Sequence, residues 1–521
     1  MRWDIVTCTP ISDKFAFKAK GEWIMVFDYG QNGQFTGGNG RTGSGFGDGD
    51  EFEAGQRVRL QLDAVASEAL SGEVFFEIGG HKWGKAATGG SGGTALGADQ
   101  VDTIKLRRAF IDWVVPQTDL KIRMGLQGMA LPSFTTQSMV FNDDVAGIVA
   151  SYKFNDNVSL SAIWARPYND NYAPDSTTHY QNRGGFLDNV DAFSLVLPLS
   201  FDGIKVTPWA MYAALGPNFW SKTTSDGGIP SELADWGTSK RWISAGMFPA
   251  GGARHKDGTA ANDGEGGRRL TSYGNAWWFG LTGDVTALDP FRIAWDINYG
   301  SVVWPDDGRL NRQGWLASLL FEYKLDWGIP GIYGWYGSGD DSAPSNGSER
   351  MPSVSTDNTN NGFSDFAMNG APWWHSREGV LSYNMTGTWG IGVRLKDVSF
   401  VEDLKHTLWI NLMGGTNSPA MAKKISSSNW GKDSVRKPNG LPNRTDYGFD
   451  PLYMTTLDHA LEIGLRNVYQ MYENFQIYFE GAYIATWLDH SDSVWGKSKM
   501  NGKNDEVRDP WNINLSFVYS F

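Results

Sequence analysis

The sequence predicts an all-β protein, a single transmembrane antiparallel β-barrel of about eighteen strands, with sixteen as the alternative. Three observations predict this fold. Apolar and polar residues alternate with a period of two over most of the chain, short and long connections follow each other in turn, and aromatic residues gather at segment ends. Only every second residue of such a barrel faces lipid, so a mean hydropathy of −0.37 is compatible with it.

The alternation is clear at both ends of the chain. Residues 15–27 place apolar side chains at odd positions and Lys18, Lys20 and Glu22 at even positions, and residues 511–521 alternate in the same way. Successive side chains of a strand point to opposite faces, so each segment has one apolar and one polar face. A helix would need apolar residues about 3.6 positions apart, and this spacing is absent.

The alternating segments give the strand count and the two rims. We expect strands near residues 14–28, 56–67, 72–81, 102–115, 119–127, 144–154, 157–166, 190–200, 203–215, 273–286, 290–304, 313–326, 329–337, 387–397, 403–414, 456–469, 474–487 and 510–521. Tight connections such as 116–119 and 201–203 alternate with long polar ones such as 216–272 and 338–386. This alternation predicts short periplasmic turns at one rim and long extracellular loops at the other.

A water-soluble all-β protein also alternates, but it fits this chain less well. Many of the segments reach about 12–15 residues, whereas strands of soluble proteins usually have about 5–6. No linker divides the chain into domains of ordinary size. Residues 1–13 are interpreted as an N-terminal extension and residues 14–521 as the barrel. The extension lacks the apolar stretch of a signal peptide, so we expect that such a peptide has been removed or that the sequence starts irregularly.

Composition excludes several classes of function. The formal net charge is −13, and no basic stripe dominates, which argues against nucleic acid as a partner. Cys8 is the single cysteine, so a disulfide scaffold and a zinc site built from a cysteine cluster are both excluded.

Two parts of the sequence carry a resemblance to a known family. The ending DPWNINLSFVYSF resembles the C-terminal strand of outer-membrane proteins, which the barrel-assembly machinery reads, so Tyr519 and Phe521 are the implied assembly signal. The segments FAFKAKGEWIMVF and RVRLQLDAVASEALSGEVFFEIG resemble the homotrimeric porins of sulfate-reducing bacteria. The resemblance implies the outer membrane of a Gram-negative bacterium, a homotrimer, and contact with outer-membrane lipid and lipopolysaccharide. Eighteen strands, however, match the sugar-specific trimeric channels of the maltoporin type, whereas general porins have sixteen.

Charged residues of the early strands predict a pore constriction. In porins the third long loop folds into the lumen and faces a basic wall, and the matching segment here is 128–143. Its end supplies the acidic pair Asp143 and Asp144. The basic wall is predicted to consist of residues whose neighbours face lipid, namely Arg57, Arg59, Arg107, Lys121 and Arg123. Arg107 and Arg108 are adjacent, which predicts a bulge, a protein interface or a position near the rim, because arginine facing mid-membrane lipid costs about 2–4 kcal/mol.

Other residues with chemical potential have simpler interpretations. The 24 tryptophans include the pairs Trp277–Trp278 and Trp373–Trp374, which suggest a stacking path for sugars, although interfacial girdles and loop packing explain tryptophan better. Loop carboxylates Asp48, Asp50, Asp340 and Asp341 are weak candidates for calcium, and solvated loop charge is the simpler interpretation.

We therefore predict a porin that passes small hydrophilic solutes and ions by diffusion, with no cofactor and no enzymatic activity. The glycine-rich motif GNGRTG lacks the strand and helix that a dinucleotide site requires, and no nucleophile–base set can be named. A substrate-specific channel for sugars or small anions is the alternative, and an outer-membrane barrel enzyme is a more distant one.

Overall fold

The computed structural model describes most of the predicted strands. It covers residues 6–7, 16–31, 51–86, 93–96, 104–169, 189–217, 246–249, 272–306, 308–343, 346–354, 363–364, 366–367, 381, 385–422, 454–489 and 509–521. Some residues singled out in the sequence lie outside these ranges, namely Cys8, the calcium candidates Asp48 and Asp50, and the Trp373–Trp374 pair.

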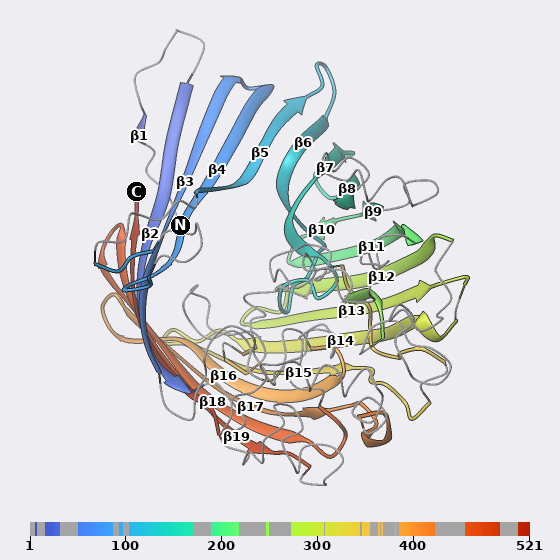
Figure 1. The fold of residues 1–521 in the computed structure, drawn as a ribbon. Helices are drawn as coiled ribbons and strands as arrows, with labels where there is room; N and C mark the ends of the chain where they lie inside the picture. Colours follow the sequence, from blue (N-terminus) through green and yellow to red (C-terminus); the bar gives the residue numbers. More distant parts are fainter. Residues whose placement is uncertain are drawn as a thin grey trace.

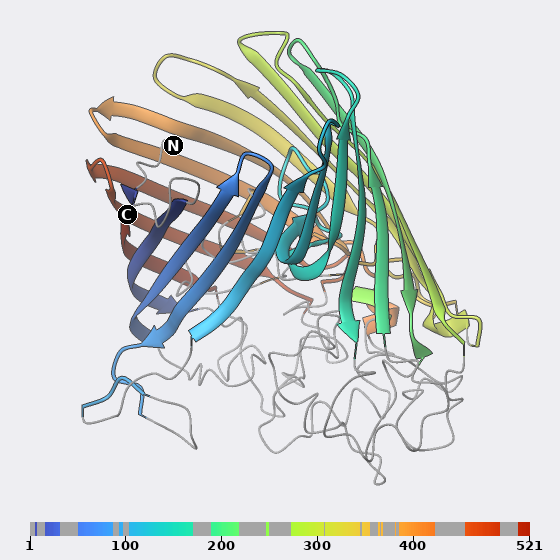
Figure 2. The same ribbon diagram turned by 90° about the horizontal axis from the view of Figure 1, so that it is seen from above.

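The described part of the chain forms one closed antiparallel β-barrel with eighteen strands in its wall (Figures 1 and 2). The wall strands are β2 (Ala16–Gln31), β3 (Glu51–Ser67), β4 (Leu70–Lys82), β5 (Ile104–Val114), β6 (Leu120–Ala130), β7 (Asn142–Lys153), β8 (Ser159–Asn169), β9 (Asn189–Val196) with its continuation β10 (Leu199–Phe201), β11 (Ile204–Leu215), β12 (Gly274–Val285), β13 (Phe291–Val303), β14 (Arg312–Tyr323), β15 (Ile329–Gly337), β16 (Thr388–Val401), β17 (Leu404–Gly415), β18 (His459–Tyr472), β19 (Phe475–Trp487) and β20 (Trp511–Ser520). Each pairs with its chain neighbours, and β2 pairs with β20 to close the ring. The two-residue strand β1 (Val6–Thr7) adds beside β2. The prediction of eighteen strands is confirmed.

The outer face of the barrel is apolar and has aromatic rings at both rims. Near the short turns, Phe291 packs edge-on against Tyr323 with ring centroids 4.7 Å apart. At the opposite rim, Trp315 stacks on Tyr336 at 5.0 Å. Between the rims the exposed side chains are apolar, and they include Phe193 and Phe279 beside aliphatic residues. β14 shows the alternation, with Leu319 exposed and its inward neighbours buried. This arrangement matches the apolar band and flanking girdles of membrane barrels.

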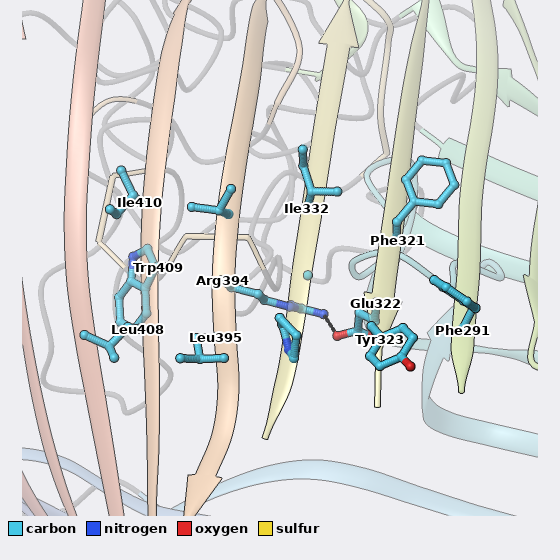
Figure 3. A pocket seen from close by; sticks show the side chains of 13 residues that line it. Phe291, Phe321, Glu322, Tyr323, Ile332, Arg394, Leu395, Leu408, Trp409 and Ile410 are labelled. Carbon is cyan, nitrogen blue, oxygen red and sulfur yellow. Dashed lines mark hydrogen bonds and ion pairs between the residues drawn. The ribbon is translucent and has the colours of Figure 1, made fainter. Parts of the chain in front are cut away.

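The outer face is not smooth everywhere. Where β15 presents Pro330 and Gly331 between bulkier neighbours, a shallow groove of about 640 Å³ opens over β13–β17 (Figure 3). Its rims carry Phe321, Ile332 and Ile410, so it is a depression in an apolar surface.

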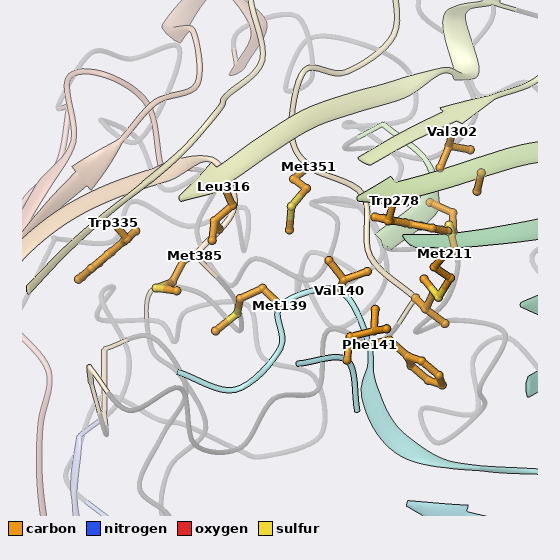
Figure 4. Packing of buried hydrophobic residues seen from close by; sticks show 14 of the residues in the cluster. Met139, Val140, Phe141, Met211, Trp278, Val302, Leu316, Trp335, Met351 and Met385 are labelled. Carbon is orange, nitrogen blue, oxygen red and sulfur yellow. The ribbon is translucent and has the colours of Figure 1, made fainter. Parts of the chain in front are cut away.

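The interior departs from a simple water-filled lumen. Apolar side chains that point inward from β8, β9, β11–β15 and β17–β19 pack with loop residues into one buried cluster (Figure 4). Met139, Val140 and Phe141 of the third loop lie in this cluster beside Trp278 and Leu316 of the wall. Nine buried methionines belong to it, and the flexible thioether fills irregular space well.

One hairpin leaves the wall and enters the barrel. β5 pairs with β6 only along Ala109–Val114, and β7 pairs with β8 only from Gly147 onward. Residues 127–146, the end of β6 and the start of β7, pair with each other and with no other wall strand among the described residues. We call this segment the inner hairpin. β6 visibly bends away from β5 in Figure 1. Its loop spans 131–141, shorter than the predicted 128–143 because the strands extend into the loop from both sides.

The inner hairpin bends at two glycines that face each other. Gly125 and Gly147 are direct cross-strand partners at the level where the hairpin leaves the wall. Gly125 has a φ of 132°, and a Cβ there would lie 2.3 Å from the carbonyl oxygen of Ala109. A side chain would prevent this backbone approach, so the glycine pair permits the crease.

The barrel closes where the C-terminal residue, Phe521, meets Gly21 of β2. The N–H of Gly21 donates to the carbonyl of Phe521 (2.7 Å), and the N–H of Phe521 donates to the carbonyl of Gly21 (3.0 Å). The Phe521 ring covers Gly21, where an added Cβ would come 2.5 Å from a ring carbon and 2.4 Å from the carbonyl oxygen of Arg59. The absence of a side chain at Gly21 therefore makes room for the C-terminal phenylalanine.

Gly21→Ala is predicted to destabilise the barrel by about 1–3 kcal/mol. The added methyl group would overpack the contact between Gly21 and the Phe521 ring and displace Phe521 or the β3 backbone. The urea midpoint of heat-modifiable gel mobility measures the loss. Gly72→Ala is the matched control, since a Cβ there would meet nothing closer than 3.4 Å. Equal urea midpoints for Gly21→Ala and Gly72→Ala would contradict a role for the contact between Gly21 and Phe521 in barrel closure.

Candidate functional site

The loop of the inner hairpin is fixed to the far wall by one carboxylate. Asp296 on β13 accepts hydrogen bonds from the Ser133 hydroxyl (2.7 Å) and from the N–H groups of Phe134 and Thr135 (2.9 Å each). The hydroxyls of Thr135 and Thr282 also donate to it. Its side chain is nearly fully buried, and a buried carboxylate is stable only when donors surround it in this way. Asp296 thus holds the loop across the lumen.

Glu462 on β18 fixes a second loop segment in the same way. One of its oxygens accepts the Ser364 hydroxyl (3.1 Å) and the N–H groups of Phe366 (3.3 Å) and Ala367 (3.2 Å). The side-chain amide of Asn411 donates to its other oxygen at 2.8 Å. A wall carboxylate again binds the backbone of an inward segment.

Arg312 on β14 provides the opposite polarity. Its guanidinium donates to the carbonyls of Arg350 (3.1 Å), Phe248 (3.0 Å) and Met351 (3.0 Å). Two loop segments are therefore bound to one fully buried arginine. Together the three wall side chains hold loop backbone against β13, β14 and β18, which narrows the space left for solutes.

The opposite side of the lumen, along β2 to β5, is strongly charged. Arg59 bonds Glu77 (Nε–Oε2 3.0 Å) and reaches Glu22 (3.3 Å), and Arg57 lies 3.4 Å from the same Glu22 oxygen. Arg107 bonds Glu77 at 3.0 Å. We call the whole group the basic cluster. Its five cations are Arg57, Arg59, Lys105, Arg107 and Arg108, and its three carboxylates are Glu22, Glu77 and Asp144. Positive charge is therefore in excess there.

A bulge in β5 turns two adjacent arginines to the same side. Phe75 pairs with Arg108 and Phe76 with Leu106, so Arg107 has no partner of its own in β4. A bulge was one of the three alternatives that the sequence allowed. Both arginines reach Asp144 of the inner hairpin, Arg107 through Nε at 2.7 Å and Arg108 through Nε at 2.7 Å. The extra residue lets neighbours in sequence share one acceptor.

The predicted constriction residues separate into two groups. Arg57, Arg59 and Arg107 lie together, and Asp144 joins them through Arg107. Lys121 and Arg123 instead pair with Asp112, Arg123 through two bonds of 2.7 Å and Lys121 at 3.2 Å. Asp143 is exposed and accepts the N–H of Asp144 at 2.7 Å. The structure therefore does not bring Lys121 and Arg123 to the acidic pair, because Asp112 on neighbouring β5 lies directly across from Arg123.

Sequence reasoning did not single out several residues of the site. Alternation contained the signal for two of them: Glu22 lies on the polar face of its segment, and Arg108 is adjacent to Arg107. Asp296 and Glu462 gave no local signal, because the loop residues that they bind lie more than 90 positions away in the chain.

The wall opposite the basic cluster carries balanced charge. Glu322 accepts a hydrogen bond from Arg394 at 2.7 Å (Figure 3). It also accepts one from Arg292 at 2.8 Å, and Arg292 in turn bonds Asp284 at 2.7 Å. Each of these cations has a carboxylate partner, whereas the basic cluster has five cations for three carboxylates. On β18 and β19, which lie next to β20, Arg466 likewise pairs with Glu480 at 2.8 Å.

A cavity of about 480 Å³ lies against the basic cluster. Its lining includes Lys20, Arg59, Arg107 and Arg108, the carboxylate of Glu22 and the ring of Phe75. The Arg108 guanidinium sits 5.3 Å from the centre of that ring. Cationic donors beside one aromatic face make a setting suited to a small anion, aromatic or aliphatic.

Tryptophan has several roles in this barrel. Trp277 is 47% exposed on the outer face, whereas Trp278 is fully buried and donates to the carbonyl of Pro352 at 2.8 Å, so the pair points to opposite sides as predicted. Inward Trp209 and Trp409 lie flat over Gly280 and Gly464 of the paired strands. Loop packing and the outer girdles thus account for these tryptophans.

The loop carboxylates proposed for calcium have other partners. Asp340 accepts the Ser348 hydroxyl, and Asp341 accepts the N–H of Ala343 (2.6 Å) and the amide of Asn346 (3.1 Å). No group of three or more His, Cys, Asp or Glu side chains within the described ranges is arranged to hold a metal ion. In these ranges no helix is long and apolar enough to cross a membrane.

Comparison with known proteins gives a likeness in fold. No family model and no curated protein matches the sequence. OpdQ of Pseudomonas aeruginosa superimposes with a TM-score of 0.45 at 10% identity, covering 97% of this chain and 98% of its own. OccK9 (OpdG) of the same species gives 0.47 at 9% identity, covering 98% and 100%. A loop-deletion mutant of OmpT, an outer membrane protein of Vibrio cholerae, gives 0.38 at 8% identity, covering 98% and 100%. At these values the likeness extends to the fold alone.

Asp296→Ala is predicted to free the loop 131–141 from β13 and to increase single-channel conductance, because the buried donors of Ser133 and Thr135 lose their acceptor. Limited proteolysis within this loop should rise in parallel. Asp112→Ala is the matched control, since its carboxylate binds only Lys121 and Arg123 among the described residues. Unchanged conductance and proteolysis in the Asp296 variant would contradict the anchoring role.

The loop that contains Glu349 is predicted to be more stable in acid. Burial, together with the nearby Asp340 and Asp341, raises the pKa of Glu349 above its ordinary value. An acid with a raised pKa holds its proton more tightly in the folded loop, so this contribution is present at low pH and is lost as pH rises through the raised pKa. Amide hydrogen exchange of residues 340–350 should therefore accelerate from about pH 4 to about pH 7 beyond its intrinsic pH dependence. Glu349→Gln should remove the excess, and an identical excess in that variant would refute the assignment.

Proposed function

We propose that the protein is an outer-membrane porin, a passive channel for small hydrophilic solutes in a Gram-negative bacterium. One observation carries the proposal: a closed barrel has an apolar outer face with aromatic rims and an inner wall that bears the basic cluster. Closure pairs the backbone groups that lipid cannot satisfy. The charged inner wall needs water, which a channel supplies.

The packed interior favours a selective channel over a wide general one. The inner hairpin and the loop segments held by Asp296, Glu462 and Arg312 occupy much of the lumen near the long-loop rim. What remains borders the basic cluster, whose excess positive charge attracts anions and raises their local concentration. A channel with preference for small anions is therefore the form of the proposal that the residues support best, and a sugar channel is the second form.

The assembly of the channel is part of the proposal. A homotrimer in contact with outer-membrane lipid and lipopolysaccharide is the expected state. Tyr519 and Phe521 on the closing strand are the proposed signal for the barrel-assembly machinery. Calcium at the loop carboxylates remains a weak proposal, and equilibrium dialysis measures it directly.

Planar bilayer recording tests the channel and its selectivity. The wild-type protein should give stepwise currents, and a salt gradient should give a reversal potential of the sign expected for anions. Arg59→Gln should lower the anion-to-cation permeability ratio on the order of twofold, because it removes a cation from the cluster in excess.

Arg394→Gln is the control, since it changes the lumen charge by the same amount on the wall of β14 and β16, where Glu322 balances it. An equal shift in both variants would contradict a localised basic filter. The absence of current from the folded barrel would overturn the channel itself.

A further inference from the structure

The inner hairpin leaves a window in the barrel wall. Within the described part of the chain, Ile104–Leu106 and Arg108 of β5 pair with β4, and no residue of Ile104–Arg108 pairs with β6. Arg166–Asn169 of β8 likewise pair with no residue of β7. The strands that flank the hairpin therefore remain in place while the hairpin folds inward. Between these two strand edges the wall has no backbone ladder, and we call this gap the window.

An apolar groove leads to the window from outside. The groove has a volume of about 590 Å³, and its largely apolar lining includes Met124, Ala146, Ile148, Trp164 and Tyr168. Arg166 and Asn169 also line it, and Arg166 is paired with Asp191 at 2.8 Å. This volume suits a short alkyl chain or a small aromatic group. Met124 and Ile148 lie on the same face of β6 and β7 as the outer apolar band, so the groove opens on the surface that the proposed function places in lipid.

A second cation, Arg108, lies beyond the groove and binds the hairpin residue next to its lining. On the face that carries Ala146, the next residue along β7 is Asp144, about 7 Å away at strand spacing. Asp144 accepts Arg108, whose guanidinium lies against Gly128, where an added Cβ would come 2.8 Å from Nη2. Glycine at 128 leaves the room that Arg108 occupies in the window.

Arg108 retains capacity to bind an anion. Its Nε donates to Asp144, and neither Nη donates a hydrogen bond within the described residues, although Glu73 interacts with this guanidinium electrostatically. The side chain is 38% exposed. It also lines the lumen cavity that holds Phe75 and Arg59. One guanidinium thus lines the charged lumen and binds Asp144, the hairpin residue that follows Ala146 on the same face.

We propose that the window is a lateral binding site for a single-chain anionic amphiphile, with its tail in the groove and its acidic head on the Nη groups of Arg108. The chemistry is complementary at both ends, since the largely apolar groove suits the tail and the guanidinium of Arg108, bound to Asp144 beyond the groove, suits the acidic head. The site gives such a molecule a route between the membrane and the lumen. This inference rests on the proposed channel.

Decanesulfonate is a suitable probe, because it keeps its negative charge at all working pH values. A Cys8→Ser/Ala146→Cys variant carrying an environment-sensitive fluorophore is reconstituted in zwitterionic vesicles. Decanesulfonate should change the emission saturably. In the same background, Arg108→Gln should weaken the apparent affinity about tenfold, as expected for a lost charge-assisted contact. Arg123→Gln, a cation on the same hairpin strands that is paired with Asp112, should leave the affinity within twofold.

Asp144→Asn protects the test against misfolding of the arginine variant. It retains Arg108 and frees its Nε, so affinity should be equal to or tighter than that of the parent, provided that the barrel stays heat-modifiable. Equal affinity in the parent and in Arg108→Gln would overturn the site.

Three further outcomes would overturn it as well. Brominated phospholipid that quenches the label without competition from decanesulfonate would make the groove ordinary lipid-facing surface. A label that neither probe reaches, in an oligomeric protein, would make this face a subunit interface. Decanesulfonate that leaves emission unchanged while chloride current persists would remove the window and leave the channel proposal intact.

Discussion

Closure of the backbone ladder is the constraint on which the rest of this structure depends. Around most of the ring each strand has hydrogen-bonded neighbours on both sides, and the last strand returns to the first at Gly21 and Phe521. Unpaired backbone groups cost several kcal/mol each in hydrocarbon, so a wall of this kind tolerates few exceptions. The inner hairpin is the clear exception among the described strands. Because the chain bends at Gly125 and Gly147, residues 127–146 lie inside the barrel and divide its lumen. We call them the internal partition.

The partition gives the two sides of the lumen different chemistry. Toward β9–β19 the hairpin loop and other loop segments pack into an apolar cluster, and Asp296, Glu462 and Arg312 satisfy their backbone groups. Toward β2–β5 the lumen keeps charge and therefore water. Asp144 links the two sides, because it belongs to the hairpin and accepts two arginines of the wall. A channel built in this way selects by the field on one side while the other side determines the free cross-section.

Sequence periodicity predicted the wall well and the interior poorly, for a physical reason. Two-residue alternation follows from the contrast between an apolar outer face and the opposite face, so segments such as 313–326 and 510–521 were found close to their observed bounds. Alternation does not tell whether an inward residue meets water or a folded loop. Trp278 and Leu316 were therefore not recognisable as parts of an internal core.

The candidate site shows the same division. Arg57, Arg59 and Arg107 were placed by their outward neighbours, and their common carboxylate partners Glu22 and Glu77 come from strands adjacent in the sheet. Lys121 and Arg123 satisfy the same rule but meet Asp112 first. Which carboxylate an arginine binds depends on register, and the bulge at Arg107 changes that register by one residue.

Residue-resolved amide hydrogen exchange of the barrel in micelles tests the account most directly. Amides of Ala109–Val114 should be protected throughout, whereas Ile104–Arg108 should alternate between protected amides that face β4 and exchanging amides that face the window. Uniform protection from Ile104 to Val114 would mean that β6 pairs along the whole of β5, and the inner hairpin would then belong to the wall.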